Sequence, residues 1–126
     1  MKILGIGVDI VENFRITKSL KNNLFIKRIF SNSEILIAKT IKDKKSYYSK
    51  RFAAKEAFAK ALGTGVSKGI SFNEISVNNN KDGAPFIELL GKTKICTNNL
   101  IKKKNKIYLS LSDEKLFALA MVIISY

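Results

Sequence analysis

The stretch RFAAKEAFAKALGTG, from Arg51 to Gly65, carries the strongest helix signal in the chain. Alanine, lysine, glutamate, phenylalanine and leucine fill it without a helix-breaking residue. Gly63 suits the left-handed residue that ends a helix, so we expect the helix to end at Leu62. At about 100° per residue, the residues on one apolar side of this helix are Ala54, Ala57, Phe58, Ala61 and Leu62.

Two charged residues share the other side of this helix. Glu56 and Lys60 are four residues apart, which places them next to each other on a helix surface. Small Ala53 and Ala59 flank them, and this would leave room for a ligand to approach closely. A surface ion pair worth about 0.3–0.5 kcal/mol accounts for the same two charges. The helix alone favours the ion pair, and a second element has to decide.

Composition places the chain among folded proteins with an unusual charge. Of its 126 residues, 46% are hydrophobic and 26% are charged, which is ordinary for one domain, and we expect a single domain over residues 1–126. The net charge of +13 is high. It predicts a polyanionic partner, such as nucleic acid, a phosphorylated small molecule or an acidic protein. Compositional drift toward lysine explains any single lysine equally well.

Several chemistries are excluded or made improbable by what the chain lacks. It has no histidine, which rules out histidine catalysis and histidine-bound metals, so a metal would need oxygen ligands and would be magnesium or manganese. The single cysteine, Cys96, excludes an internal disulfide and fits a reducing compartment. We find no signal-peptide pattern and no apolar run of about 20 residues. A cytoplasmic protein with no membrane partner is therefore expected.

The first eleven residues, MKILGIGVDIV, alternate as a strand does. Asp9 is the anomaly in this strand, because a carboxylate between Val8 and Ile10 should be at least partly buried. Burial is costly unless the carboxylate is paired or bound to a metal. An aspartate that caps the following turn is the competing explanation.

The remaining patterns predict an α+β fold. In the first half we expect a helix capped by Asn13 and running toward Asn22, an apolar segment over 24–30, a helix from a Ser31–Glu34 capping box to about Ile41, a charged loop over 42–45, and the main helix from near Ser46. After a loop over 66–70, we expect strands over 72–77 and 85–90 around a turn at 78–83, a helix over 92–104 with Ile95, Leu100 and Ile101 inward, and strands over 107–111 and 116–126.

The helices thus lie mainly in the first half, and a mostly antiparallel sheet forms in the second. Residues 116–126 are almost continuously apolar, so both faces of that strand should be covered, in the core or at a subunit interface.

Asp9 and Glu56 are the two acidic residues in the most structured surroundings. If the fold brings them together, they form a two-carboxylate site typical of magnesium bound by carboxylates and phosphate oxygens. Nearby lysines would neutralise a phosphorylated substrate. Alone this is a weak signal, because nearly any protein offers two acids that could meet.

Two segments together strengthen it. GIGVDIVE, from Gly5 to Glu12, and the 51–65 segment resemble the two signature motifs of the holo-acyl-carrier-protein synthases, the bacterial phosphopantetheinyl transferases. Their order and spacing fit that family, and the resemblance covers essentially the whole chain. Further matches are Arg15-Ile16, FIKRIFSNSE at 25–34, GAP at 83–85 and SLSDEKLFALAMVI at 110–123.

The resemblance implies the chemistry and assigns residues to it. Asp9 and Glu56 would bind Mg²⁺ that bridges the pyrophosphate of coenzyme A, whose phosphopantetheine arm moves to a serine hydroxyl of acyl carrier protein. The reaction would release adenosine 3′,5′-bisphosphate and support fatty acid biosynthesis. Lys60 would stabilise charge on the leaving nucleotide or donate a proton to it, while Glu56 and a metal-bound water both remain candidates for taking the serine proton. The residues implied to contact coenzyme A are Arg51, Lys55, Gly63, Thr64, Gly65 and Pro85, although helix capping explains Gly63 equally well.

The family resemblance also implies partners. Family members are homotrimers with active sites at subunit interfaces, which would suit the long apolar strand at the end of the chain. Acyl carrier protein is acidic, and in the family it docks on basic residues of the first helix, so steering of this partner would explain part of the +13 charge. The candidate docking residues are Arg15, Lys18, Lys21 and Arg28.

One position departs from the family pattern. The family usually has histidine after the SxS of the late strand, near the nucleotide phosphates, and this chain has Asp113. Either Lys115 or another lysine compensates for the repulsion, or coenzyme A binds more weakly, and Asp113 is left out of the expected site.

Two other functions stay open from the sequence. A basic nucleic-acid-binding domain would place lysines and aromatics on one exposed surface. Here the aromatics at Phe52, Phe58, Phe72 and Phe117 occupy core-like positions, so we expect no nucleic-acid partner. An inactive scaffold of the same fold is the third possibility, which the Asp113 substitution keeps open.

Overall fold

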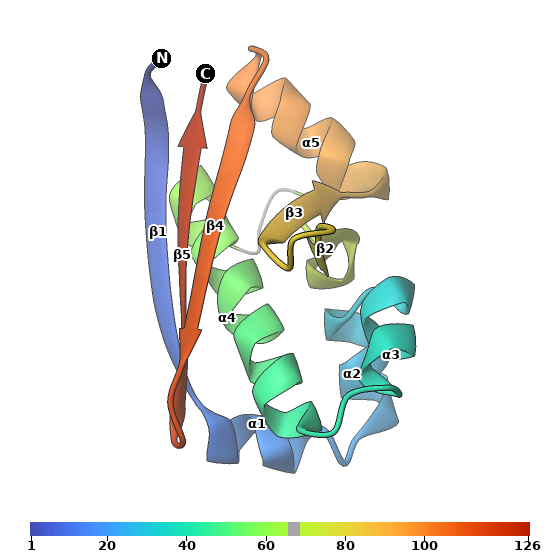
Figure 1. Ribbon diagram of the computed structural model, residues 1–126. Coiled ribbons are helices and arrows are strands. Elements are labelled where there is room, and N and C mark those ends of the chain that lie inside the picture. Colours follow the sequence, from blue (N-terminus) through green and yellow to red (C-terminus); the bar gives the residue numbers. More distant parts are fainter. Residues whose placement is uncertain (66–68) are drawn as a thin grey trace.

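The structure, a computed structural model, describes residues 1–65 and 69–126. Its main sheet is antiparallel with strand order β1-β5-β4, so the first and last strands of the chain lie side by side (Figure 1). A separate hairpin is formed by β2 and β3. The strands are β1 (Ile3–Glu12), β2 (Ile75–Asn79), β3 (Pro85–Leu89), β4 (Lys106–Asp113) and β5 (Phe117–Ser125).

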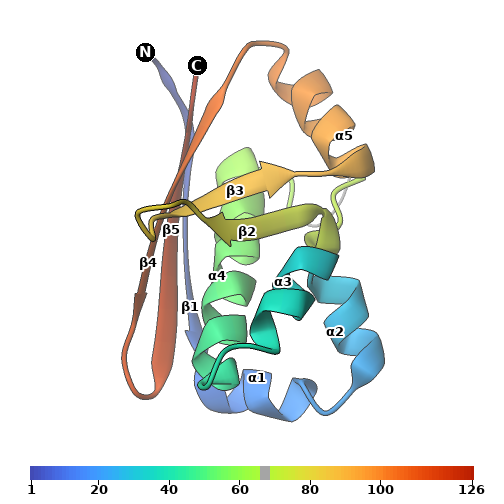
Figure 2. The same ribbon diagram turned by 45° about the vertical axis from the view of Figure 1, so that its right-hand side comes forward.

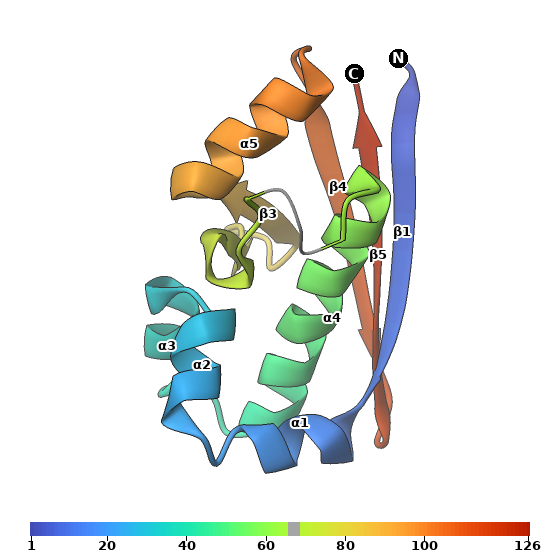
Figure 3. The same cartoon turned by 180° about the vertical axis from the view of Figure 1, so that it is seen from behind.

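The helices gather on one side of the main sheet. The long helix α4 lies along its inner face, with α1 crossing below and α2, α3 and the β2–β3 hairpin on the far side of α4 (Figures 2 and 3). The helices are α1 (Asn13–Ser19), α2 (Asn23–Ile29), α3 (Asn32–Ala38), α4 (Lys44–Leu62), the short 3-10 helix η1 (Phe72–Glu74) and α5 (Gly91–Ile101). The predicted α+β fold is confirmed, although the segment predicted as a strand over 72–77 begins with η1. Residues 66–68 of the predicted loop lie outside the described residues.

Two glycines let α4 approach β1 closely. A Cβ built on Gly5 would overlap the carbonyl oxygen of Ala61, and one built on Gly7 would overlap the carbonyl oxygen of Ala57. A backbone carbonyl cannot yield as a flexible side chain can, so each position requires glycine for this packing. The helix has alanines at the same contacts, so its own side chains there are also small.

α4 is buried on nearly all sides, which the sequence did not indicate. Ala53 and Ala59, expected beside an open surface, are buried in the core. The sheet covers one side of the helix, and Phe30 and Tyr48, whose rings lie 4.5 Å apart, belong to the core on the other. These two alanines therefore do not border the space that was expected beside Glu56 and Lys60.

A buried ion pair joins α4 to α3 and β2. Lys55 Nζ donates to both carboxylate oxygens of Glu34, at 2.7 and 3.0 Å, and to the carbonyl oxygen of Ile75 at 2.5 Å. The Glu34 carboxylate also accepts from the backbone N–H of Ser31 and of Val77, each at 2.8 Å. The first of these bonds completes the predicted capping box of α3, which is confirmed. Both charged side chains are fully buried, so this network ties α3, α4 and β2 together.

Two helix starts differ from expectation. α4 begins at Lys44, before the predicted Ser46, because the Asp43 side chain accepts from the Ser46 N–H at 3.1 Å and caps the helix there. Asn13 is the first residue of α1 and not its cap; its side-chain amide donates to the carbonyl oxygen of Lys115 at 3.2 Å. Asn13 thereby joins α1 to the β4–β5 turn.

The inward face of α5 was predicted wrongly for Ile95 and Leu100, whereas Ile101 packs against the core as expected. Thr93 and Thr97 are buried, whereas Ile95 and Leu100 are exposed and Ile101 is half-buried. The Thr93 hydroxyl accepts from the segment before η1 and donates to a carboxylate of η1, so hydrogen bonds fix the helix where apolar contacts were expected.

The outer face of the main sheet is apolar and exposed. Side chains alternate along β1 and β5, so the inward positions are small or buried and the outward ones are exposed. No element within residues 1–65 and 69–126 covers this outer face (Figure 1). In the single chain, one face of β5 is thus left uncovered, so the expected cover of both faces would require a subunit interface. The exposed outward residues of the two strands are Ile6, Val8, Ile10, Phe117, Leu119 and Met121.

We expect Glu34→Ala to destabilise the protein by about 3–5 kcal/mol, because it leaves the Lys55 ammonium buried without a counter-charge. Urea unfolding followed by circular dichroism measures the loss. Glu88→Ala, which removes an exposed carboxylate, is the matched control and should change stability by about 0.5 kcal/mol or less. Equal stability of the two variants would contradict the role given to the Lys55–Glu34 pair.

Candidate active site

The close contact between β1 and α4 also decides where Asp9 lies. Gly5 lies against Ala61 and Gly7 against Ala57, so the strand and the helix run in opposite directions. Two strand residues span about 6.6 Å and four helix residues about 6 Å. Every second residue of β1 therefore faces every fourth residue of α4 along the contact. The next inward position on β1 is Asp9, and the preceding helix turn contains Glu56. Residues 47 positions apart in the sequence are therefore brought together.

Lys60 is paired with Asp9 in the structure. Its ammonium lies 3.1 Å from Asp9 Oδ1 and 3.0 Å from the carbonyl oxygen of Val8. The Asp9 side chain is 16% exposed and that of Lys60 is 54% exposed, so a fixed carboxylate faces a solvent-accessible ammonium. The surface ion pair weighed for this helix thus exists for Lys60, but its partner is Asp9 and not Glu56.

Glu56 belongs to the same group of charges. Its pKa is raised above the ordinary value, first by burial and then by the charge of Asp9, while Lys60 lowers it in part. Asp9 and Glu56 line one pocket of about 430 Å³ between β1, α1, α2 and α4, which we call the carboxylate pocket. Arg15, Phe25 and Phe52 are among its other lining residues.

The donor set of the carboxylate pocket fits magnesium. Mg²⁺ is commonly bound by one or two carboxylates and completes its shell with water and substrate phosphate oxygens. Asp9 and Glu56 offer two carboxylates; burial and then the charge of Asp9 raise the pKa of Glu56, and a divalent cation would relieve the repulsion between the two groups. In the described part of the chain, no group of three or more aspartate, glutamate, cysteine or histidine side chains is arranged to bind a metal. A metal here would therefore take its remaining ligands from water or from a substrate.

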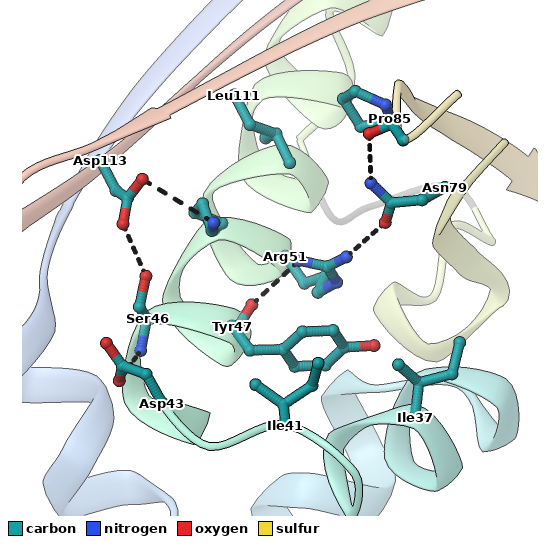
Figure 4. A pocket seen from close by; sticks show the side chains of 12 residues that line it. Ile37, Ile41, Asp43, Ser46, Tyr47, Arg51, Asn79, Pro85, Leu111 and Asp113 are labelled. Carbon is teal, nitrogen blue, oxygen red and sulfur yellow. Dashed lines mark hydrogen bonds and ion pairs between the residues drawn. The ribbon is translucent and has the colours of Figure 1, made fainter. Parts of the chain in front are cut away.

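A second pocket lies around Arg51 (Figure 4). It has a volume of about 540 Å³ and is bounded by α3, α4, the β2–β3 turn and the end of β4; we call it the arginine pocket. The Arg51 guanidinium stacks on the Tyr47 ring, 3.7 Å from its centroid, and donates to Asn79 Oδ1 at 2.8 Å. Its Nε is buried and has no hydrogen-bond partner among the described residues. Pro85 lines the same pocket, so two of the residues implied to contact coenzyme A meet here.

The arginine pocket also contains residues that were not predicted. Tyr47 and Lys50 lie on α4 and Asn79 at the end of β2. Lys50 directly precedes Arg51, and this position could have identified it from the sequence as a residue of the same pocket. Asn79 reaches the pocket from a remote hairpin, and nothing in its local sequence indicates this.

Lys55 does not belong to either pocket. Its side chain is fully buried, and its ammonium is occupied by Glu34 and the Ile75 carbonyl oxygen. The expectation that Lys55 contacts coenzyme A is therefore corrected, and we assign this residue to the stability of the fold.

The residues after α4 stay predictions for ligand binding. Gly63 ends the helix in the left-handed conformation, with φ 82°, as expected for a cap. Gly65 also has a positive φ of 62°, and the Thr64 hydroxyl donates to the Gly65 carbonyl oxygen at 3.1 Å. These three residues lie one helix turn beyond Lys60.

The predicted docking residues lie on α1, on α2 and in the turn between these helices. Arg15 lines that pocket, and Lys18 lies one turn further on α1, 4.7 Å from the centroid of the Phe14 ring. Lys21 and Arg28 are exposed, after α1 and on α2 respectively. Their role in docking stays a prediction.

The two pockets lie on different sides of α4. They share no lining residue, and Arg51 and Glu56, five residues apart, point about 140° away from each other around the helix axis. One chain thus presents two separate pockets, one with carboxylates and one with an arginine, that do not form a single cavity.

Comparison with known proteins defines the class. The family model of the 4′-phosphopantetheinyl transferase superfamily matches residues 5–119, and the chain belongs to this superfamily. Within it, the chain is 57% identical to the holo-[acyl-carrier-protein] synthase of Pelagibacter ubique, with 98% of each chain covered. The resemblance found in the sequence is confirmed.

Solved structures agree in fold. The holo-[acyl-carrier-protein] synthase of Neisseria meningitidis is 35% identical and superposes with a TM-score of 0.91, covering 99% of this chain and 100% of that one. The enzyme of the same name from Bacillus anthracis, in complex with CoA (3′,5′-ADP), is 37% identical with a TM-score of 0.81, covering 97% and 96%.

The aromatic side chains that the sequence analysis assigned to the core differ in their burial. Of the aromatics assigned to the core, Phe58 and Phe72 are buried and Phe52 is half-buried. Phe117 is exposed on the outer face of the sheet, so that assignment is wrong for the single chain.

We expect Glu56→Gln to raise the melting temperature of the metal-free protein at pH 7. Because the pKa of Glu56 is raised on folding, the folded state binds this proton more tightly than the unfolded chain does. The ionised side chain therefore costs stability at pH values above the ordinary glutamate pKa of about 4.3, and the cost disappears below it.

Differential scanning calorimetry from pH 4 to pH 8 in the presence of a chelator measures the difference. It should shrink toward pH 4, and the exposed control Glu88→Gln should show no such trend. A variant no more stable than the wild type at pH 7 would contradict the assigned electrostatics.

Proposed function

We infer that the chain transfers the phosphopantetheine arm of coenzyme A to a serine hydroxyl of apo-acyl carrier protein, releasing adenosine 3′,5′-bisphosphate. The chain is a phosphopantetheinyl transferase of the holo-[acyl-carrier-protein] synthase kind. The observation that carries this function is the meeting of Asp9, Glu56 and Lys60 beside one pocket, in a chain of this superfamily. We treat residues 1–126 as one transferase domain, because β1 and β5 pair the two ends of the chain.

The residues of the carboxylate pocket divide the work of the transfer. Asp9 and Glu56 would bind Mg²⁺. The bound ion would neutralise part of the negative charge of the diphosphate. Lys60 stabilises the charge that develops on the leaving phosphate as the diphosphate P–O bond breaks. The serine oxygen forms the new P–O bond, and the proton of its hydroxyl passes to the Glu56 carboxylate or to a water molecule in the pocket. Phosphoryl transfer depends mainly on positioning and charge stabilisation, which these three side chains provide.

The complete site is formed by two chains in our proposal. The carboxylate half of one subunit faces the arginine half of the next, in a closed ring that we propose is a homotrimer. Such head-to-tail contacts close into rings when the rotation between subunits allows it. The apolar outer face of the β1-β5-β4 sheet supports this assembly, because an uncovered face of this kind usually marks an interface.

The acidic carrier protein docks on α1 and α2 in this account. Arg15 lines the carboxylate pocket, where the serine must arrive. Lys18, Lys21 and Arg28 are exposed residues of the same two helices and of the turn between them. The net charge of +13 would speed the encounter by electrostatic steering.

We place the reaction in the cytoplasm, in support of fatty acid biosynthesis. The free thiol of Cys96 fits a reducing compartment. Among the helices of the described residues, none combines the length and apolar character needed to cross a membrane.

We expect Asp9→Ala and Glu56→Ala to abolish transfer, and Lys60→Ala to slow it by about 10²–10³-fold, because each removes charge stabilisation at the reacting diphosphate. The assay incubates the protein with apo-acyl carrier protein, coenzyme A and Mg²⁺ and detects the mass gain of one phosphopantetheine group. Circular dichroism checks that the fold is retained.

Lys94→Ala, on the exposed side of α5, is the matched control for loss of a lysine and should keep full activity. An active Glu56→Ala enzyme would count against the assigned mechanism. A wild-type protein that transfers nothing would favour the inactive-scaffold alternative.

We expect two inactive variants to restore activity when mixed. In Glu56→Gln the carboxylate half is damaged and in Arg51→Ala the arginine half is damaged, so a mixed ring contains interfaces with two intact halves. Random mixing in equal amounts gives about a quarter of the interfaces this composition. Co-expression followed by the transfer assay measures it, and light scattering compares the assembly with three times 14.1 kDa. Mixtures as inactive as each variant alone would show that the two halves belong to separate functions.

A further inference from the structure

An ion pair between Lys50 and Asp113 lies inside the arginine pocket (Figure 4). Lys50 is on α4, next to Arg51, and Asp113 is the last residue of β4. Neither residue was expected from the sequence to contact coenzyme A. Their side chains are 28% and 39% exposed, so both can meet a ligand that enters the pocket.

The carboxylate of this pair is held in place. The Ser46 hydroxyl donates to Asp113 Oδ2 at 2.7 Å. Ser46 is itself buried in the first turn of α4, and its N–H is bound by the capping side chain of Asp43. Asp113 is thus fixed to the start of the helix, and the Asp43 carboxylate is already used as the cap.

The ammonium of the pair is held loosely. Lys50 Nζ lies 3.7 Å from Asp113 Oδ1, which is longer than the 2.7–3.2 Å of an N–H···O hydrogen bond. Lys50 can therefore turn toward an anion without breaking a hydrogen bond. Its attraction to Asp113 still keeps it at the edge of the pocket.

Arg51 alone cannot neutralise a phosphomonoester. Such a group carries close to two negative charges near pH 7, and a guanidinium carries one positive charge. The Arg51 guanidinium is oriented by Tyr47 and Asn79, with a buried Nε that has no partner in the described part of the chain. Lys50 is the adjacent cation that could supply the second charge.

We propose that Lys50 is a specificity residue for the 3′-phosphate of coenzyme A, and that Asp113, fixed by Ser46, positions Lys50 and limits how tightly that phosphate is held. The proposal rests on the function inferred above. If the diphosphate is bound at the carboxylate half of the site, the remaining anionic group of coenzyme A is the 3′-phosphate, and it would meet the arginine half of the neighbouring subunit. The negative charge of Asp113 repels this phosphate while it holds the lysine that attracts it.

The test compares coenzyme A with 3′-dephospho-coenzyme A, which lacks only the group in question. Isothermal titration calorimetry measures the dissociation constants of both for the wild-type protein in Mg²⁺. We expect Lys50→Met to raise the dissociation constant of coenzyme A by about tenfold, because one charge-assisted contact is lost. The dissociation constant of 3′-dephospho-coenzyme A should change by no more than about twofold. Lys50→Arg should keep the preference for coenzyme A.

Asp113→Asn should act in the opposite direction. Removing one negative charge near the phosphate should lower the dissociation constant of coenzyme A by about 3–10-fold. The dissociation constant of the dephospho analogue should stay nearly unchanged. In the transfer assay, Lys50→Met should raise KM for coenzyme A and change kcat little. Lys94→Met, which removes an exposed lysine on α5, is the control and should not change the affinity for either ligand.

Two results would overturn the proposal while the inferred function stands. One is a wild type that binds and transfers normally, with both ligands weakened equally by Lys50→Met. The other is an Asp113→Asn variant that binds coenzyme A more weakly. A wild type that neither binds coenzyme A nor transfers its arm would overturn the inferred function and this proposal with it.

Discussion

The structure depends on how closely α4 packs against β1. Gly5 and Gly7 leave no side chain between the strand and the helix, and the carbonyl oxygens of Ala61 and Ala57 occupy that space. At this separation, Asp9 lies beside the helix turn of Glu56 and within 3.1 Å of the Lys60 ammonium. A larger residue at either glycine would move the helix away and separate the charged groups. The same contact therefore builds the core and assembles the reactive half of the site.

In our proposal, the arginine pocket of a neighbouring subunit completes the site. The arginine pocket lies on another side of α4, where Tyr47 and Asn79 orient Arg51. A helix that is buried nearly all round cannot bring both halves into one cavity of its own chain. The apolar outer face of the main sheet offers the surface through which further copies would supply the missing half. Folding, assembly and activity are then linked through one helix.

The sequence predicted those features that depend on local chemistry. The core helix followed from a run without breakers, its end from the suitability of Gly63 for the left-handed conformation, and the α3 start from the Ser31–Glu34 capping box. Long-range contacts were the source of the errors. Nothing near Lys55 in the sequence shows that Glu34 will bury it, and α5 turns threonines inward because distant polar groups bind them. The meeting of Asp9 with Glu56 followed from family resemblance, since no local pattern fixes a contact across 47 residues.

The central claim is that the carboxylate half and the arginine half come from different subunits and close on one ligand. The most direct measurement is a crystal structure of the protein with Mg²⁺ and adenosine 3′,5′-bisphosphate. Our account predicts a ring of three chains, with the ion on Asp9 and Glu56 of one subunit and the nucleotide against Arg51 of the next. A nucleotide bound within a single chain, or an ion bound away from Asp9 and Glu56, would contradict it.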